Sequence, residues 1–320
     1  MALGEFELIE RYFSRPVRRA ALGVGDDCAL LAPRAGMQLA VSSDLLVEGR
    51  HFLSTVQPDR LGHKALAVNL SDLAACGAEP LGFTLSLALP RADEAWLEAF
   101  ARGLFALAER HGCELVGGDT TRGPLTINIT VFGEVPDGQA LLRDGARAGD
   151  DVYVSGTLGD ARLALEAFRG TLALPGADFE QARRAMETPE PRVALGVALR
   201  GLATSAIDVS DGLAGDLAHV LRRSGVGATL EAPALPRSAV LARQAVQWQY
   251  LCTLSGGDDY ELVFTAPPAR RAQVEAAARG AGVPVTRIGR IEAQPGLRVL
   301  DEQGRPIGLA LHAFDHFRSP

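Results

Sequence analysis

The chain has 320 residues, which is long enough for two domains that each have a hydrophobic core. Its hydrophobic residues (47%) and charged residues (22%) are in the range of ordinary folded globular proteins. The formal net charge of -7 argues against a nucleic-acid-binding protein, which normally carries a basic patch. No apolar run is long enough to span a bilayer, so we expect neither nucleic acid nor membrane among the partners.

Lysine and cysteine usage narrow the possibilities further. Lys64 is the only lysine, so a lysine-based phosphate site has a single candidate, and we expect this side chain to lie on the surface. The cysteines are widely spaced, without a Cys-x-x-Cys pair, and are expected to be reduced, mostly buried thiols. Because the N-terminus also lacks the apolar core of a signal peptide, we expect a cytoplasmic protein.

Periodic patterns predict a series of helices and strands in the first part of the chain. Residues 5–13 have helical spacing, with Phe6 and Phe13 on one face. Apolar residues at every second position predict a strand over 82–89. Asp93 is expected to cap a long helix that ends at His111. The other elements expected here are strands over 37–43, 114–116 and 126–131 and a helix over 58–76.

A turn-rich stretch over 136–150 indicates a boundary between domains. A strand over 151–155 follows it, and helices and strands then alternate to the C-terminus. The sequence therefore predicts two α/β domains, over 1–140 and 148–320.

Six short acidic segments are set among Gly, Ser or apolar residues rather than among other surface charges. A carboxylate is costly beside apolar surface unless a cation or hydrogen-bond donors pair with it. Repeated along the chain, such segments suggest a shared site rich in hard oxygen ligands, which favours Mg²⁺ and the phosphates that accompany it. The segments are Gly25-Asp26-Asp27, Ser42-Ser43-Asp44, Asn69-Leu70-Ser71-Asp72, Gly117-Gly118-Asp119, Asp208-Val209-Ser210-Asp211 and Gly256-Gly257-Asp258-Asp259.

A single Asp beside Gly or Ser is more often a turn residue or a helix cap than a metal ligand. Three of the segments combine further features that favour a ligand. Asp208 ends an apolar strand, and Asp211 could cap the helix that follows. Asp119 follows a strand and a Gly pair that lets a ligand approach the backbone. Asp72 lies within an apolar helix end, where an unpaired carboxylate would be costly.

Other motifs give weaker signals. The sequence contains no P-loop and no protein-kinase motif set. The segment Gly156-Thr157-Leu158-Gly159-Asp160 could present N–H groups to a phosphate, but an ordinary strand-to-helix turn is the favoured interpretation. His51 alone is undecided between a structural and a binding role, and His316 is expected to be structural. Arg143 is a loop arginine of the kind that is normally solvated, although near a nucleotide it would bind phosphate.

In order along nearly the whole chain, the motifs resemble those of the thiamine-monophosphate kinase family, in the superfamily of aminoimidazole ribonucleotide synthetase. Gly117-Gly118-Asp119-Thr120-Thr121-Arg122-Gly123 and Ser255-Gly256-Gly257-Asp258-Asp259-Tyr260-Glu261-Leu262 point to the thiamine branch. The resemblance implies ATP-dependent addition of a second phosphate to thiamine monophosphate, with several Mg²⁺ ions and ATP as co-substrate. It also implies an α/β (α+β) fold of two domains, with an N-terminal ATP- and magnesium-binding domain that forms a β-barrel in a homodimer, and a C-terminal α/β domain.

The resemblance also implies roles for individual residues. The implied metal ligands are Asp27, Ser42, Ser43, Asp44, Asp72, Asp119, Asp208 and Asp211. The implied ATP contacts are Gly118, Asp119, Arg143 and Ser210, and the implied substrate contacts are His51, Asp258 and Phe314. The chain departs from the family at two of these positions: Asp258 stands where Glu is frequent, and Phe314 where Trp or Tyr is frequent.

The implied reaction needs no general base, because the acceptor phosphate is already ionised near neutral pH. Catalysis would be positioning and charge neutralisation in a direct in-line transfer. Two alternatives stay open on the sequence: another ATP-dependent synthetase of the superfamily, and a non-catalytic nucleotide-binding maturation scaffold. A scaffold should have degraded acidic segments or a long partner-binding tail, and this sequence has neither.

Overall fold

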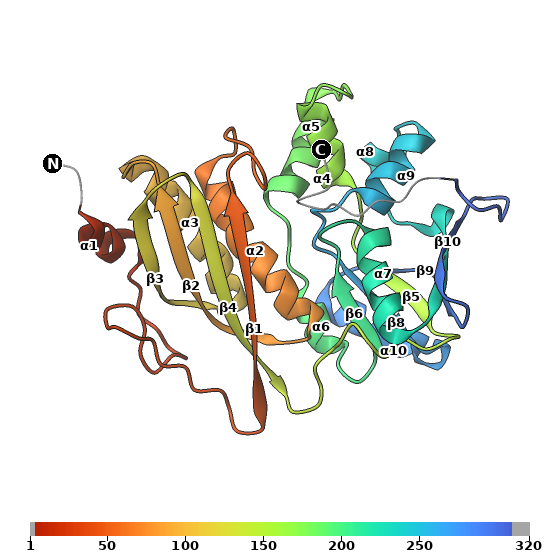
Figure 1. The fold of residues 1–320 in the computed structure, drawn as a ribbon, viewed down its shortest axis with the longest axis horizontal. Coiled ribbons are helices and arrows are strands. Elements are labelled where there is room, and N and C mark those ends of the chain that lie inside the picture. Colours follow the sequence, from red (N-terminus) through yellow and green to blue (C-terminus); the bar gives the residue numbers. More distant parts are fainter. Residues whose placement is uncertain (1–3, 309–320) are drawn as a thin grey trace. The chain divides into compact units, whose positions relative to one another are not determined.

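The computed structural model describes residues 4–308, and the chain divides into two compact units (Figure 1). The N-terminal unit comprises Met1–Leu73 and Ala78–Gly138, and the C-terminal unit comprises Ala74–Gly77 and Gln139–Pro320. In the described part of the chain, no helix is both long and apolar enough to cross a membrane. All four cysteines are free thiols, as expected. Cys113 and Cys252 are buried, whereas Cys76 is half-buried and Cys28 is exposed, so fewer thiols are buried than expected.

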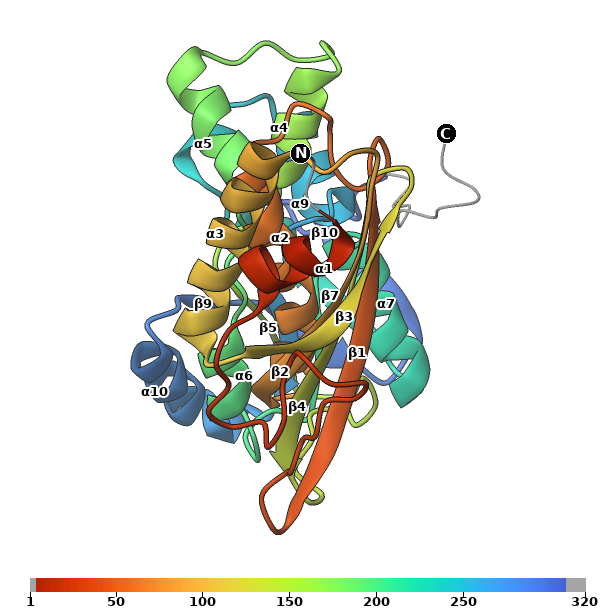
Figure 2. The ribbon, with the colours of Figure 1, turned by 90° about the vertical axis from the view of Figure 1, so that its left-hand side faces the viewer.

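The N-terminal unit is built on a four-stranded sheet with the strand order β1-β4-β2-β3. β4 pairs antiparallel with both of its neighbours, and β2 pairs parallel with β3. Helices α2 (Pro58–Ala75) and α3 (Glu94–His111) cover one face of this sheet (Figure 2). The strands are β1 (Met37–Val47), β2 (Glu79–Leu89), β3 (Glu114–Arg122) and β4 (Thr126–Pro136).

The expected alternation in β2 is confirmed, because Phe83, Leu85 and Leu87 are buried. Asp93 caps α3 as predicted, with its carboxylate accepting the Trp96 N–H. Two glycines let α2 and α3 approach until their backbones touch. A Cβ on Gly103 would collide with the Asp59 carbonyl, and one on Gly62 would collide with the Phe100 carbonyl.

The helical segment expected over 5–13 is confirmed as a short helix α1 (Glu5–Leu8) followed by a π-helix (Ile9–Phe13), although Phe6 is 82% exposed and Phe13 is buried. Two other local predictions in this unit are wrong. Lys64 is buried, because α2 is covered on nearly every side rather than on one stripe. The strand expected to stop at 116 continues through the Gly-Gly-Asp segment to Arg122, because parallel pairing with β2 extends over those residues.

The segment between α1 and β1 is held to the sheet by two glutamates. Glu114 accepts hydrogen bonds from the backbone N–H groups of Arg18, Arg19 and Ala20. Glu134 is fully buried and forms ion pairs with the side chains of Arg19 and Arg34. The loop that carries Asp27 is therefore anchored on both sides.

The C-terminal unit contains a six-stranded sheet with the order β10-β7-β9-β5-β8-β6. β10 and β7 are parallel, and the other neighbours are antiparallel. The strands are β5 (Asp151–Ser155), β6 (Ser205–Asp208), β7 (Gly227–Glu231), β8 (Leu262–Ala266), β9 (Val285–Glu292) and β10 (Gly296–Leu300). The α-helices are α4 (Asp160–Phe168), α5 (Gly176–Glu187), α6 (Val193–Ala198), α7 (Leu213–Ser224), α8 (Ala239–Ala242), α9 (Val246–Ser255) and α10 (Arg271–Ala281).

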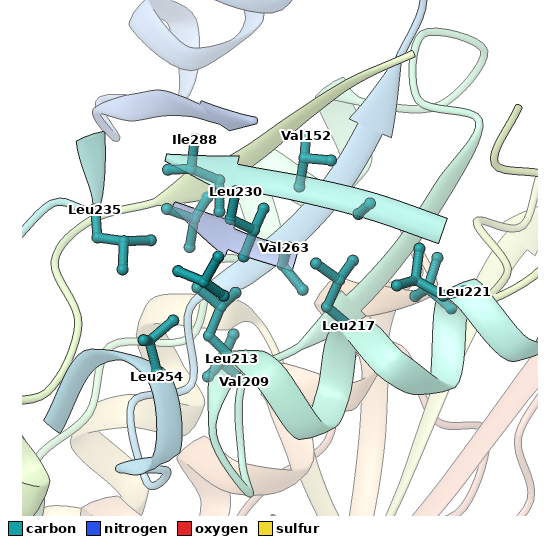
Figure 3. Close-up of a cluster of buried hydrophobic side chains, with 14 of the residues drawn as sticks. Val152, Val209, Leu213, Leu217, Leu221, Leu230, Leu235, Leu254, Val263 and Ile288 are labelled. Atoms are coloured by element: carbon teal, nitrogen blue, oxygen red, sulfur yellow. The ribbon is translucent and has the colours of Figure 1, made fainter. Parts of the chain in front are cut away.

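Helix α7 packs its apolar face on this sheet. Figure 3 shows Leu213, Leu217 and Leu221 pointing toward strand residues such as Val152 and Val263. All of these side chains are buried, and together they fix the start of α7 beside the end of β6. This packing positions the loop between β6 and α7, which carries Ser210 and Asp211.

Candidate active site

Three predicted metal ligands of the N-terminal unit, Ser42, Asp44 and Asp72, lie together between β1 and α2. Ser42 donates a hydrogen bond of 2.5 Å from its Oγ to Oδ2 of Asp72. The backbone N–H of Asp44 donates to Oδ1 of Asn69 at 3.2 Å, and Asn69 is buried on the same helix as Asp72. Ser42 and Asp44 are two residues apart on β1 and so point to the same side of the strand, and their hydrogen bonds to Asp72 and Asn69 show that this side faces α2.

The two carboxylates affect each other electrostatically. Burial, and then the negative charge of Asp72, raise the pKa of Asp44 to about 6. Two neighbouring carboxylates repel each other, and a cation between them would relieve this repulsion. Among residues 4–308, no group of three or more His, Cys, Asp or Glu side chains is arranged to hold a metal ion.

The pairing register puts two other predicted residues on the opposite face of the same sheet. Ser43 pairs with Thr130, and Asp119 pairs with Ser86, whose other partner is Asn128. Asn128 donates to Oγ of Ser43 at 3.1 Å, and Asp119 is exposed. Asp119 and Ser43 therefore share a face that differs from that of Asp44.

Gly118 has a structural reason to be glycine, in addition to its predicted contact with ATP. Its φ angle is 146°, and a Cβ would collide with the carbonyl oxygen of Leu85 on the neighbouring strand. The adjacent Asp119 is thereby carried on backbone that runs close against β2.

Asp27 and His51 lie in loops of the N-terminal unit. Asp27 is exposed, and its N–H donates to the Asp26 carboxylate. His51 follows β1, where its Nδ1 accepts the N–H of Val47 at 3.0 Å. In the neutral imidazole this bond leaves the proton on Nε2, which makes Nε2 the hydrogen-bond donor of this ring.

In the C-terminal unit, the loop after β6 is organised by an aspartate that sequence analysis missed. Asp208 is the last residue of β6 and is buried. Oδ2 of Asp216 accepts the backbone N–H groups of both Ser210 and Asp211 at 3.0 Å. Asp211 does not cap α7 as predicted; the capping position is Gly212, which has no side chain to offer. An acidic residue in the apolar face of α7 was the signal that could have identified Asp216.

The loop that carries Asp258 is bonded to the loop that carries Ser210. The N–H of Asp258 donates to the carbonyl of Ser210 at 2.7 Å, and that of Tyr260 donates to Val209 at 2.9 Å. Asp258 and Tyr260 have φ angles of 63° and 52°, which are unusual for residues other than glycine. The structure thus brings a predicted substrate residue beside a predicted ATP residue.

Arg143 lies within electrostatic range of the same loop. Burial raises the pKa of Asp216 to about 7, and the positive charge of Arg143 is a smaller effect that lowers it. This charge also acts with burial and Arg222 to lower the pKa of His219. Phe314 and His316 lie outside the described residues.

The segment Gly156-Thr157-Leu158-Gly159-Asp160 is a strand-to-helix turn, as favoured from the sequence. The N–H of Gly159 donates to Oδ1 of Asp259 at 2.9 Å, so this donor is occupied by the protein itself.

Comparisons with known proteins place these residues in a family. The model for the N-terminal domain of AIR synthase related proteins matches residues 25–135, and the model for the C-terminal domain matches residues 147–302. The chain is 47% identical to the thiamine-monophosphate kinase of Escherichia coli O157:H7, with 100% of both chains covered. The crystal structure of thiamine-monophosphate kinase from Stenotrophomonas maltophilia K279a superposes on this chain with a TM-score of 0.86, covering 96% of this chain and 99% of the other. The two sequences are 47% identical.

This chain belongs to the thiamine-monophosphate kinase family. A further relative of known structure is AaThiL complexed with AMPPCP and TMP, at 31% identity and a TM-score of 0.75 over 87% of each chain. E. coli HypE, a hydrogenase maturation protein, has a TM-score of 0.78 over 96% of each chain, but at 22% identity this likeness shows the shared fold alone. The mixed α/β architecture of two domains expected from the sequence is confirmed.

The residues at the family's expected magnesium positions fit that ion chemically. The donors between β1 and α2 are hydroxyl, amide and carboxylate oxygens, which are the ligands that Mg²⁺ prefers. Burial, and then the negative charge of Asp72, raise the pKa of Asp44, so a cation placed here would favour the charged form of this carboxyl group. Magnesium is usually held by one or two carboxylates together with substrate phosphates and water, so a pair of carboxylates meets this need.

Proposed function

We propose that this protein uses ATP to phosphorylate thiamine monophosphate, giving thiamine diphosphate and ADP. The observation that carries this proposal is full-length identity of 46–47% to curated thiamine-monophosphate kinases, with 100% of this chain covered. A relative of known structure was obtained with an ATP analogue and TMP, which supports the same pair of ligands here.

The proposed magnesium ligands are divided between the two units. Asp27, Ser42, Ser43, Asp44, Asp72 and Asp119 belong to the N-terminal unit, and Asp208 and Asp211 to the C-terminal unit. These residues would hold magnesium, which when bound would supply positive charge to neutralise the phosphates of the two reactants. Asp44 and Asp72 are the best supported pair, because the structure brings them together.

The proposed ligand contacts follow from the donors that each residue offers. Arg143 and the backbone around Gly118, Asp119 and Ser210 would bind the phosphates of ATP. His51, with its proton on Nε2, would donate to the substrate, while Asp258 and Phe314 would contact the thiamine moiety. No general base is required, so these residues act by holding the two polyanions in line.

The decisive test measures ADP release with thiamine monophosphate beside purine precursors as acceptors. In the presence of ATP, we expect ADP release with thiamine monophosphate and none with the purine precursors. Release only with a purine precursor would identify a synthetase of the same superfamily, and nucleotide binding without turnover would identify a maturation scaffold.

The two halves of the site can be separated by two alanine variants. Asp258→Ala should weaken thiamine-monophosphate binding far more than ATP binding, because it removes the carboxylate proposed to meet the aminopyrimidine and the cationic thiazolium. Arg143→Ala should do the reverse, since it removes a cation from the phosphates of ATP. Calorimetric titration of each variant with each ligand measures both effects, and equal losses for both ligands in both variants would contradict the assignment.

We also propose that the protein is a homodimer in which two N-terminal sheets close into a β-barrel. The sheet face opposite α2 and α3 carries exposed apolar residues on edge strand β1: Leu39 is 47% exposed, Val41 56% and Leu45 52%. An exposed apolar row along an edge strand is a common pairing surface and a solubility hazard when left uncovered. A second copy of the same face would cover it with matching side chains.

Sedimentation at micromolar concentration should show about twice the mass of the 33.8 kDa chain. Val41→Asp should dissociate the dimer, because it would bury a charge in an apolar interface. Phe6→Asp is a matched control, since Phe6 is exposed and lies outside the sheet. A monomer in the unchanged protein, or a dimer that survives Val41→Asp, would contradict this assembly.

A further inference from the structure

Asp216 is a buried acid on a helix face that is otherwise apolar. It lies in the first turn of α7 and is 4% exposed, beside the core residues Leu213 and Leu217. Its Oδ2 accepts two backbone hydrogen bonds, both 3.0 Å long, from consecutive residues, Ser210 and Asp211. A carboxylate at the start of a helix also interacts favourably with the helix dipole. These contacts fix the conformation of the loop through which the chain passes from β6 into α7.

That loop is in turn bonded to the segment after α9. Three backbone hydrogen bonds join them: Asp258 N–H to Ser210 at 2.7 Å, Tyr260 N–H to Val209 at 2.9 Å, and Val209 N–H to Glu261 at 2.8 Å. A Cβ on Gly257 would meet the Ser210 carbonyl oxygen at 2.5 Å, so the two segments are in direct contact. Any shift of Ser210 must therefore move Asp258 as well.

We propose that Asp216 is a positioning residue that fixes Ser210 and Asp211 for nucleotide and magnesium binding and, through the Ser210 carbonyl, fixes Asp258 for the thiamine substrate. This inference rests on the proposed function for the identity of the two ligands. It assigns to one carboxylate, which touches neither ligand, control over both halves of the site.

The bonding pattern argues for preorganisation rather than for general stability. Two adjacent N–H groups that converge on one oxygen atom require one particular loop conformation. Sites that bind polyanions depend on donors and ligands that are already in place before binding. Hydrophobic packing by Leu213 and Leu217 would hold α7 on the sheet without help from Asp216.

The test compares Asp216→Ala, Asp216→Asn and Asp151→Ala in the full chain. Asp216→Ala removes the acceptor and admits water, whereas Asp216→Asn keeps an amide oxygen that can accept both N–H groups. Asp151→Ala is the matched control, because Asp151 is also a buried acid of the C-terminal unit and forms an ion pair with Arg271. In the sheet it lies opposite Ala266, at the far end of β8 from Leu262.

We expect Asp216→Ala to raise the KM for ATP and the KM for thiamine monophosphate together, each by about tenfold or more. Calorimetric dissociation constants for a non-hydrolysable ATP analogue with Mg²⁺, and for thiamine monophosphate alone, should rise in parallel. Asp216→Asn should restore both to within about threefold of the unchanged protein. Asp151→Ala should lower the unfolding temperature and leave both KM values and both dissociation constants unchanged.

Three results would overturn the proposal. Unchanged ligand constants in Asp216→Ala would assign the residue to stability alone. A change for one ligand only would refute the link through the Ser210 carbonyl, and failure of Asp216→Asn to rescue would refute the role of the acceptor oxygen. If the unchanged protein released no ADP with thiamine monophosphate, the proposed function would fail, while analogue binding would still decide the effect of Asp216 on the nucleotide.

Discussion

Asp44→Asn and Asp72→Asn should each reduce turnover by at least about a hundredfold, because each removes a charged oxygen ligand from a proposed magnesium site. The effect should be largest at limiting Mg²⁺, when the weakened site is least occupied. Steady-state ADP release across a magnesium titration measures it. Asp93→Asn is the matched control, since Asn also caps helices and the Asp93 carboxylate caps α3 rather than being a proposed magnesium ligand.

The stability of the same variants separates a lost ligand from a damaged fold. Because the pKa of Asp44 is raised in the folded state, its ionisation costs folding free energy in the metal-free protein. The contribution of Asp44 to folding stability is therefore fully present below pH 3.8, the pKa of this carboxyl group in the unfolded chain. It is lost as the pH rises through about 6, the pKa of Asp44 in the folded protein. Asp44→Asn should abolish this part of the pH dependence and should not destabilise the metal-free protein at pH 8. Near-normal turnover of both variants at limiting Mg²⁺ would remove the pair from the magnesium site.

Glu261→Ala should destabilise the protein by about 3–5 kcal/mol, because it leaves a largely buried arginine without its partner. The Glu261 carboxylate accepts a two-pronged hydrogen bond from Arg192, at 2.7 Å and 2.5 Å, and a third bond of 2.5 Å from Ser155. The side chains of Glu261 and Arg192 are 7% and 20% exposed, so water replaces these bonds poorly. Urea unfolding followed by circular dichroism measures the loss.

The double variant Arg192→Met, Glu261→Leu tests whether the loss comes from an orphaned charge. Replacing both partners of a buried ion pair with apolar residues is often neutral or stabilising, so the double variant should recover most of the lost stability. If the double variant were as unstable as the sum of its single variants, the pair would not be the source of the effect. Arg279→Ala is the control, because its ion pair with Glu275 is exposed and contributes little.

Local sequence signals predicted the features that depend on neighbouring residues. The bounds of β5 and the Asp93 cap of α3 follow from short-range pattern and capping chemistry. An unpaired Asp72 carboxylate on an apolar helix end would be energetically costly, which marked it as a site residue, and the structure places it beside Asp44. In these cases the physical reason for a residue lies within a few positions of it.

Features that depend on contacts between distant segments were not predictable in the same way. Lys64 is buried because α2 is enclosed on nearly every side, and a helix pattern alone does not show which neighbours enclose it. The strand expected over 114–116 was predicted too short, because pairing with the distant strand β2 keeps Gly117 and Gly118 in it. The bonds of Asp216 were missed because they join a helix to the loop before it, and sequence analysis had assigned capping to Asp211.

The close contact between α2 and α3 helps to fix the position of Asp72 relative to the sheet. With the backbones touching at Gly62 and Gly103, α2 has no room to slide or roll against α3, and its side chains keep a fixed register with β1. A methyl group at either glycine would push α2 away and move Asp72 relative to Asp44, and misplacement of about 1 Å in a reacting site can cost a hundredfold in rate. The spacing of the two acids is thus set in part by hydrogen atoms on two glycines that never meet a ligand.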